Sequence, residues 1–344
     1  VLTTQLYRTL NGINPGQGYC IAMLMIIISV AILAFNNRMI GTRKNYTTVT
    51  GKSSNISLIN LKKGRNVISV IALILIVAVS ILPLVSFAIE SLILQPGDYS
   101  LKNFTLQFWI GTAEDNSIAN NEAGLLRNPA LWTSLFNSLK LSLICAFTAG
   151  TLGFLAGYGI VRGRGTKLAK VVDNLAFFPY LMPSMAFSVI YLSMFSTRHG
   201  IIPSLYGSFF LLVLIGTVKY MPFASRSGIN AMMQLSNQIE EAGEIIGVNW
   251  PKRMLRLVIP IQKSSFISGY LLPFTSCMRE LSLFVLLVTP SNRVLTTLLF
   301  YYNEKGWNQY SNGINLMIVL IVLAVNGLVN KLTGASIDKG IGGK

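Results

Sequence analysis

Residues 67–93 read VISVIALILIVAVSILPLVSFAIESLI, and Glu90 is the only ionisable side chain among them. An α-helix needs about 20 consecutive apolar residues to cross the hydrocarbon core of a bilayer. This stretch therefore predicts a membrane-spanning helix. Six other apolar runs bounded by polar or charged residues predict further spans. The seven predicted spans cover residues 18–36, 67–93, 136–160, 171–195, 205–225, 264–289 and 314–332.

The composition agrees with a membrane protein. Of the 344 residues, 52% are hydrophobic and only 12% are charged, whereas soluble domains are about 25% charged. We therefore expect an all-α integral membrane protein with about seven transmembrane helices. Cys20, Cys145 and Cys277 all lie in apolar stretches, where we expect small buried side chains. With His199 as the only histidine, we expect no metal site.

The charged residues alternate between the predicted links. The net charge is +16; residues 37–66 carry seven basic side chains and residues 161–170 carry four, without an acid in either segment. Residues 95–132 instead hold four acids and two bases. Cytoplasmic loops are enriched in Lys and Arg, so this alternation predicts a multi-pass protein of the cell (inner) membrane with a cytoplasmic C-terminus. The excess positive charge therefore indicates which links face the cytoplasm. We expect the protein to contact membrane lipids and not nucleic acid.

A short repeat predicts the organisation of the chain. Val1-Leu2-Thr3-Thr4 recurs as Val294-Leu295-Thr296-Thr297, and each copy precedes a leucine–aromatic pair, a polar stretch and an apolar span. Parallel repeats are a known way to build transporters. We therefore expect four segments: residues 1–36 as the last span of a preceding module, 37–66 as a basic cytoplasmic linker, 67–335 as a six-span module, and 336–344 as a cytoplasmic tail. The sequence would then begin inside a longer protein.

The cytoplasmic link 226–262 is too long for a simple turn and predicts two short helices. Asn237 and Glu240 have the spacing of a capping box for the first helix, and Gly247 suits its left-handed end. Pro251 then suits the start of the second helix, and we expect Pro260 to end it. Basic residues would mark the polar side of this helix and apolar residues its other side: Lys252, Arg253 and Arg256 against Met254, Leu255, Val258 and Ile259.

The spacing of this link is informative. It reads Glu241-Ala242-Gly243, three residues, Gly247, nine residues, Leu257-Val258-Ile259-Pro260. This closely resembles the cytoplasmic loop of type I ABC-importer permeases, written E-A-A, three residues, G, nine residues, I-x-L-P. The sequence departs from that pattern at Gly243, Leu257 and Ile259. The alternative interpretation is an amphipathic loop that lies on the membrane surface.

The resemblance implies a permease that is not itself an enzyme. In that family the loop docks on a dimer of cytoplasmic ATPase subunits, with Glu241 as the docking acid and Gly247 as the helix-turning glycine. An extracytoplasmic solute-binding protein would deliver the solute, and the ATPase would drive alternating access. Because the sequence contains no phosphate-binding loop, we expect no cofactor on this chain and ATP on its partner.

Further stretches resemble fused permeases for ferric iron, thiamine or phosphonate: residues 46–52, Leu281-Ser282 and Thr289-Pro290. Ferric iron is therefore the expected solute, with thiamine, phosphonate and polyamine as alternatives. The resemblance also makes the preceding module, in the same full-length chain, an expected partner.

Inside the predicted spans, small residues at helical spacing indicate close helix packing: Ala146, Gly150, Gly153 and Gly157. Candidate pathway or gating residues are the intramembrane charges Arg279 and Glu280, which are costly in lipid, and the helix-breaking prolines Pro179 and Pro183. A purely structural contact between helices is the alternative for the charges. A secondary transporter or channel without an ATPase also stays open; it would require buried ion-coupling acids, of which Glu280 is the main candidate. A membrane enzyme is disfavoured because no catalytic set is present.

Overall fold

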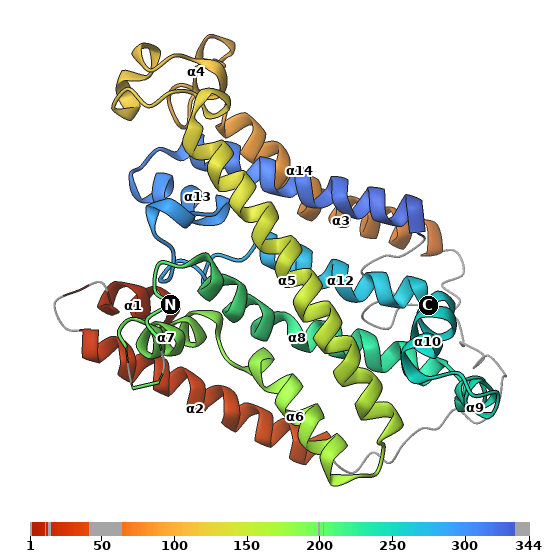
Figure 1. Cartoon of the computed structure of the whole chain (residues 1–344). Helices are drawn as coiled ribbons and strands as arrows, with labels where there is room; N and C mark the ends of the chain where they lie inside the picture. Colours follow the sequence, from red (N-terminus) through yellow and green to blue (C-terminus); the bar gives the residue numbers. More distant parts are fainter. Residues whose placement is uncertain are drawn as a thin grey trace.

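The computed structural model describes residues 2–10, 12, 15–40, 64–198, 200–201 and 203–333, and it is an all-helical bundle (Figure 1). The predicted fold class is thereby confirmed. Most of the basic linker (residues 41–63), His199 and the tail from residue 334 lie outside the described residues.

Five of the described helices are long and apolar enough to cross a membrane. They are α2 (Pro15–Ile40), α3 (Arg65–Glu90), α5 (Pro129–Arg162), α8 (Phe209–Gln234) and α14 (Asn308–Thr333). The pair α6 (Lys167–Leu181) and α7 (Ser184–Phe195) would add a sixth span, but the two helices are bent by 104°. The remaining helices are α1 (Leu2–Leu10), α4 (Gln107–Ile110), α9 (Asn237–Ile245), α10 (Trp250–Arg253), α11 (Ile259–Ile261), α12 (Lys263–Met278) and α13 (Leu295–Glu304).

Three predicted spans differ from the structure. Residues 171–195 do not form one helix: Met182 is extended, with φ −80° and ψ 130°, as expected for a residue that precedes proline. The helix predicted over 264–289 ends at Met278. Arg279 and Glu280 therefore lie in the turn that follows α12 and not within a helical span. The span predicted over 205–225 also starts and ends later, as α8.

Local capping sets several helix starts. Asn128 accepts a hydrogen bond from the backbone N–H of Ala130 at the start of α5. Thr166 caps α6 and Ser208 caps α8 in the same way. Side chains of this type satisfy the backbone N–H groups that have no partner in the first turn of a helix. The turn of residues 163–166 therefore separates α5 from α6 cleanly.

The small residues of α5 pack where they are predicted to pack. A Cβ atom added to Gly153 would lie 2.5 Å from Cβ of Ala224 on α8, and one added to Gly150 would lie 2.6 Å from the ring of Tyr270 on α12. Hydrogen bonds between hydroxyl groups join the same helices, at 2.6 Å for Thr148 and Thr217. The three helices α5, α8 and α12 thus form the centre of the bundle.

This packing leads to a first prediction. We expect Gly153→Ala to destabilise the protein by about 1–3 kcal/mol, because a methyl group at this position overpacks the contact with α8. Gly159 lies on the same helix with no atom within 4 Å of an added Cβ, so Gly159→Ala is the matched control. Thermal melting in detergent should separate the two variants. Equal melting temperatures for both would contradict the packing argument.

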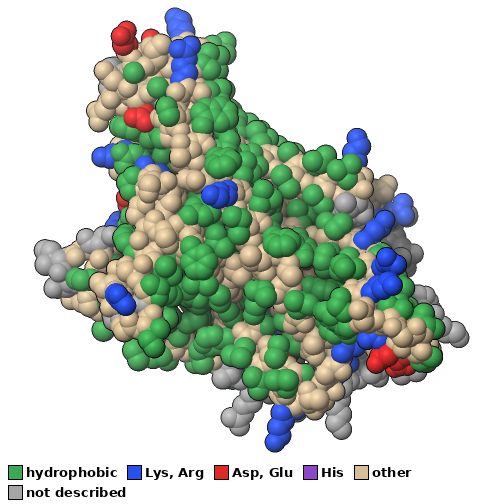
Figure 2. All heavy atoms as spheres, viewed as in Figure 1, with side chains coloured by type: hydrophobic (Ala, Val, Ile, Leu, Met, Phe, Trp, Pro, Cys, Tyr) green, Lys and Arg blue, Asp and Glu red, His purple; other side chains and the backbone are tan. Residues whose placement is uncertain are grey.

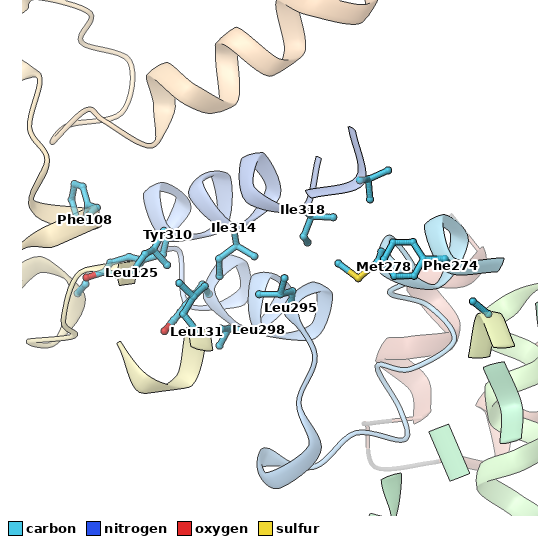
Figure 3. Packing of buried hydrophobic residues seen from close by; sticks show 14 residues of the cluster. Phe108, Leu125, Leu131, Phe274, Met278, Leu295, Leu298, Tyr310, Ile314 and Ile318 are labelled. Carbon is cyan, nitrogen blue, oxygen red and sulfur yellow. The ribbon is translucent and has the colours of Figure 1, made fainter. Parts of the chain in front are cut away.

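A second hydrophobic cluster joins α14 and α13 to the segment before α5 (Figure 3). Phe108 and Tyr310 meet edge to face with ring centroids 5.6 Å apart. The hydroxyl group of Tyr310 donates to the backbone carbonyl of Glu122 at 2.8 Å. The link 95–128 is therefore attached to the end of the bundle opposite α9 (Figure 1). Between the two ends, the visible face is broadly hydrophobic (Figure 2).

The predicted repeat has a structural counterpart. The short helix α1 precedes the 26-residue helix α2, and the short helix α13 precedes the 26-residue helix α14. α1 and α2 pack on α7 through a cluster around Leu6, Met25 and Val189. Of the three cysteines, Cys145 and Cys277 are buried as predicted, but Cys20 on α2 is exposed.

Candidate functional site

The segment from α8 to α12 folds into a helical loop that extends from one end of the bundle (Figure 1). Ser236, and not Asn237, is the N-cap of α9: its hydroxyl group accepts a hydrogen bond from the backbone N–H of Gln238. Gly247 has φ +77°. Its N–H donates to the carbonyl of Glu244, and the N–H of Val248 donates to that of Gly243, which is a Schellman motif. The predicted role of Gly247 in ending the helix is confirmed.

Glu240 anchors this loop to α5. Its side chain is 10% exposed and accepts hydrogen bonds from Nε of Arg162 at 2.8 Å and from the hydroxyl group of Tyr158 at 2.9 Å. Arg162 also donates to the side chain of Asn237. The ring of Tyr158 packs edge to face on Trp250, with centroids 5.7 Å apart. The Glu240 carboxylate thus joins α9 to the end of α5, and the Tyr158 ring adds a contact between α5 and α10.

The second helix differs from its predicted amphipathic pattern at two positions, whereas Lys252 and Arg256 are exposed and Met254 and Val258 are buried as predicted. Arg253 is 9% exposed and Leu255 is 67% exposed, the reverse of the prediction. The guanidinium group of Arg253 forms an ion pair with Glu244 at 2.9 Å. A Cβ atom added to Gly243 would lie 3.1 Å from Cδ of Arg253. Glycine at this position therefore makes room for the arginine side chain.

Pro260 does not end the second helix. Residues Met254–Val258 form a π-helical turn, in which the N–H of Ile259 donates to the carbonyl of Met254. The helix then continues through Pro260 as α11. A proline inside a helix removes one hydrogen bond and clashes with the carbonyl four residues earlier. The wider π turn immediately before Pro260 accommodates this residue.

The outer face of the loop is exposed and partly apolar. Glu241 and Ala242 are exposed, and Ile245 and Ile246 are 85% and 77% exposed. Large apolar side chains at this level of exposure are typical of contact surfaces. The neighbouring acids Glu240 and Glu241 therefore differ: the first holds the loop in place, and the second faces outward.

A second candidate site lies at the break between α6 and α7. Lys219 on α8 is 8% exposed. Its Nζ donates to the carbonyl of Pro179 at 3.0 Å and to that of Met182. The ammonium group also lies 5.7 Å from the ring centroid of Phe187. Since a helix C-terminus leaves carbonyl groups without partners and carries negative partial charge, this buried cation stabilises the end of α6.

Glu280 lies on the other side of the same break. Its carboxylate accepts from the backbone N–H of Leu283 at 3.1 Å and from the hydroxyl group of Ser184, in the first turn of α7, at 3.5 Å. An acid near a helix N-terminus is favoured by the helix dipole. Thr296 on α13 donates to the backbone carbonyl of Glu280 at 2.8 Å, so this residue also connects the break to α13.

The structure thus brings together three of the four residues predicted for pathway or gating: Pro179, Pro183 and Glu280. The fourth, Arg279, is exposed, and its Nε donates to the carbonyl of Thr275 on the preceding helix α12 at 3.1 Å. Lys219 completes the group and was absent from the sequence-based candidates. A charged residue inside a predicted apolar span was the signal that could have revealed it.

The chain was compared with known protein families. Residues 149–336 match the family described as the inner membrane component of binding-protein-dependent transport systems. The match covers more than half of the chain, including both candidate sites. The chain belongs to this family.

Several relatives of this permease are similar in sequence. The probable sulfate transport permease cysT of Prototheca wickerhamii is 22% identical, over 56% of this chain and 79% of its own. The probable ABC transporter permease y4fN of Sinorhizobium fredii is 22% identical over 86% of this chain, and the ferric iron permease FbpB 2 of Haemophilus influenzae is 26% identical over 47%. The permease spans only 50% and 31% of the lengths of these last two proteins.

Solved structures share the fold of the permease. A chain of the bacterial alginate ABC transporter in complex with its periplasmic protein matches with a TM-score of 0.58 at 13% identity, over 79% of this chain and 96% of that one. A chain of the MetNI methionine ABC transporter, in an inward-facing conformation, matches with a TM-score of 0.52 at 15% identity, over 61% and 98%. These likenesses concern the arrangement of the helices.

Proposed function

We propose that this chain is the membrane-spanning part of an ATP-driven importer and that the face formed by α9 and α10 docks on a separate ATPase subunit. The supporting observation is that the adjacent acids Glu240 and Glu241 lie in different surroundings. Glu240 fixes the loop to α5, while Glu241 and the isoleucines Ile245 and Ile246 remain exposed. A rigid, outward-facing apolar patch with one acid beside it suits a docking surface.

The loop then acts as a lever between the ATPase and the membrane helices. Glu240 connects α9 to α5, and α8 runs directly into α9. A movement of the docked face is therefore transmitted to the two helices at the centre of the bundle. ATP binding on the partner would bias the permease between two states, which is how a bound partner shifts a conformational equilibrium.

The proposed orientation puts α9 and the C-terminus in the cytoplasm. Arg164, Lys167 and Lys170 surround the turn between α5 and α6, at the same end as Arg162 and Glu240. In Figure 2, Lys and Arg side chains gather around α9 and α10. The acids of the link 95–128 lie at the other end, where an extracytoplasmic solute-binding protein would dock. This distribution follows the positive-inside rule.

Ferric iron is the solute we propose, and residues 1–36 are proposed as the end of a preceding permease module in the same chain. The likeness to a ferric iron permease and the 50% coverage of y4fN support these choices. Relatives named for sulfate and for spermidine and putrescine transport make these solutes the alternatives to test.

Capture of the ATPase tests the proposal. We expect Glu241→Ala and Gly247→Leu each to lower capture of a co-expressed nucleotide-binding subunit about tenfold. Glu241→Ala removes a contact at the centre of the docking face. Gly247→Leu changes the direction of the second helix. Leucine at φ +77° is strained, because a side chain disfavours the left-handed region. The matched control is Glu114→Ala, which removes an exposed acid at the opposite end. Undiminished capture by both loop variants would contradict the docking role.

A further inference from the structure

The two copies of the repeat agree in detail. Leu2 and Leu295 begin α1 and α13, and Pro15 and Asn308 begin α2 and α14. Each pair is separated by the same 293 residue numbers. The helices of the two copies therefore begin at equivalent positions, although few of their residues are identical.

The two copies touch at equivalent positions. The rings of Tyr7 on α1 and Phe300 on α13 meet edge to face, with centroids 5.3 Å apart and an interplanar angle of 88°. These two residues are also separated by 293 residue numbers. When a residue of one copy contacts the equivalent residue of the other, the contact lies on a two-fold axis. The contact between Tyr7 and Phe300 therefore agrees with a pseudo-two-fold arrangement of the two copies.

The surroundings of this contact are suited to a closed passage. Both rings are half-buried and line a cavity of 170 Å³ together with α7 and the turn after α12; the other lining residues are Thr3, Thr4, Met185, Leu281, Ser282 and Val285. The helices α1 and α13 lie at the end of the bundle opposite α9 (Figure 1). Burial, and then the neighbouring charge of Glu304, raise the pKa of Tyr7.

We propose that Tyr7 and Phe300 are the paired gate residues of the solute pathway, one from each module, and that their edge-to-face contact closes the pathway at the extracytoplasmic end. This inference rests on the proposed function. A path between two related modules follows their common axis, because only on this axis do both modules contribute equally. Two apolar rings that meet there exclude water and solute, and their separation opens the cavity lined by Ser282.

Cysteine accessibility tests the gate without any knowledge of the solute. In a chain with Cys20, Cys145 and Cys277 replaced by alanine, Ser282→Cys places a thiol in the cavity behind the rings. A membrane-impermeant cationic methanethiosulfonate reagent is applied to the extracytoplasmic side of right-side-out vesicles, without ATP. We expect the Tyr7→Ala/Phe300→Ala variant to react about tenfold faster than its parent, since one aromatic contact holds the gate closed.

Matched variants separate a gate from a loss of folding. Tyr7→Phe keeps the ring and should react at the parental rate, whereas Tyr7→Ala and Phe300→Ala should each accelerate labelling by a similar factor. Monodisperse size-exclusion profiles establish that each variant is folded. Labelling at the parental rate in the double variant, or a response to only one of the two single variants, would overturn the proposal. Because no ATP is present, this result is independent of whether an ATPase docks on α9.

Discussion

Replacement of Lys219 with methionine is expected to destabilise the permease by about 2–6 kcal/mol, because two buried carbonyl groups lose their partner at a cost of about 1–3 kcal/mol each. The change removes both side-chain hydrogen bonds to the carbonyls of Pro179 and Met182. These carbonyls are then buried without partners at the C-terminus of α6, where the helix dipole already favours a cation. The acid Glu280 simultaneously loses a nearby compensating charge. We therefore expect a lower melting temperature and loss of solute uptake.

Two further variants make this prediction specific. Lys219→Met combined with Glu280→Gln should lose less stability than the sum of the two single changes, because neutralising both members removes the uncompensated charge. Lys140→Met is the matched control: Lys140 also lies on a long apolar helix but is exposed, with its ammonium group 4.7 Å from the ring centroid of Phe209. If the Lys219→Met protein had the same melting temperature as the parent, the break between α6 and α7 would need no buried cation.

The second large effect is expected at Glu240. Glu240→Gln should both lower the melting temperature and weaken capture of the ATPase, because the guanidinium group of Arg162 and the hydroxyl group of Tyr158 lose a charged acceptor. Hydrogen bonds to charged groups contribute about 1.5–3 kcal/mol. Glu241→Ala, one residue away, should weaken capture without lowering the melting temperature, since that side chain is exposed.

A double-mutant cycle completes this test. The effects of Glu240→Gln and Arg162→Gln should be non-additive by about 1–3 kcal/mol, as for residues in one hydrogen-bonded network. Glu241→Ala removes an exposed acid from the same helix, and its melting temperature serves as the control for charge loss within α9. If the effects of Glu240→Gln and Arg162→Gln were additive, the two side chains would not stabilise each other. The loop would then require another anchor.

Some properties of this permease follow from the sequence because they are local. The length of the apolar run at residues 67–93 predicts a span, since the thickness of the bilayer fixes the number of residues required. The left-handed end at Gly247 and the helix start at Pro251 follow from backbone sterics within a few residues. The small residues of α5 also revealed a packed face, because only small side chains permit a close approach of two helices. The resemblance of the loop to importer permeases used the same local spacing.

Other properties depended on partners distant in the sequence. The sequence showed two adjacent acids, and only the position of Arg162, at the end of another helix, separates a buried Glu240 from an exposed Glu241. Arg253 was expected on a polar face, yet Gly243 and Glu244 provide a buried position with a charge partner. Pro260 was expected to end a helix, but a π turn directly before it lets the helix continue without the hydrogen bond that proline cannot donate. In each case a contact outside the local pattern decided the outcome.

The sequence by itself determined the membrane class, the approximate spans, the alternation of charge between links and the helix-ending role of Gly247, because bilayer thickness, backbone sterics and residue spacing act along the chain. Only the tertiary structure decided that Lys219 and Glu280 lie on either side of the break between α6 and α7. It also decided that Tyr7 meets Phe300. The physical reason is that the energy of a buried charge or ring depends on the groups that lie beside it. Those neighbours are set by the packing of the entire bundle and not by the local sequence.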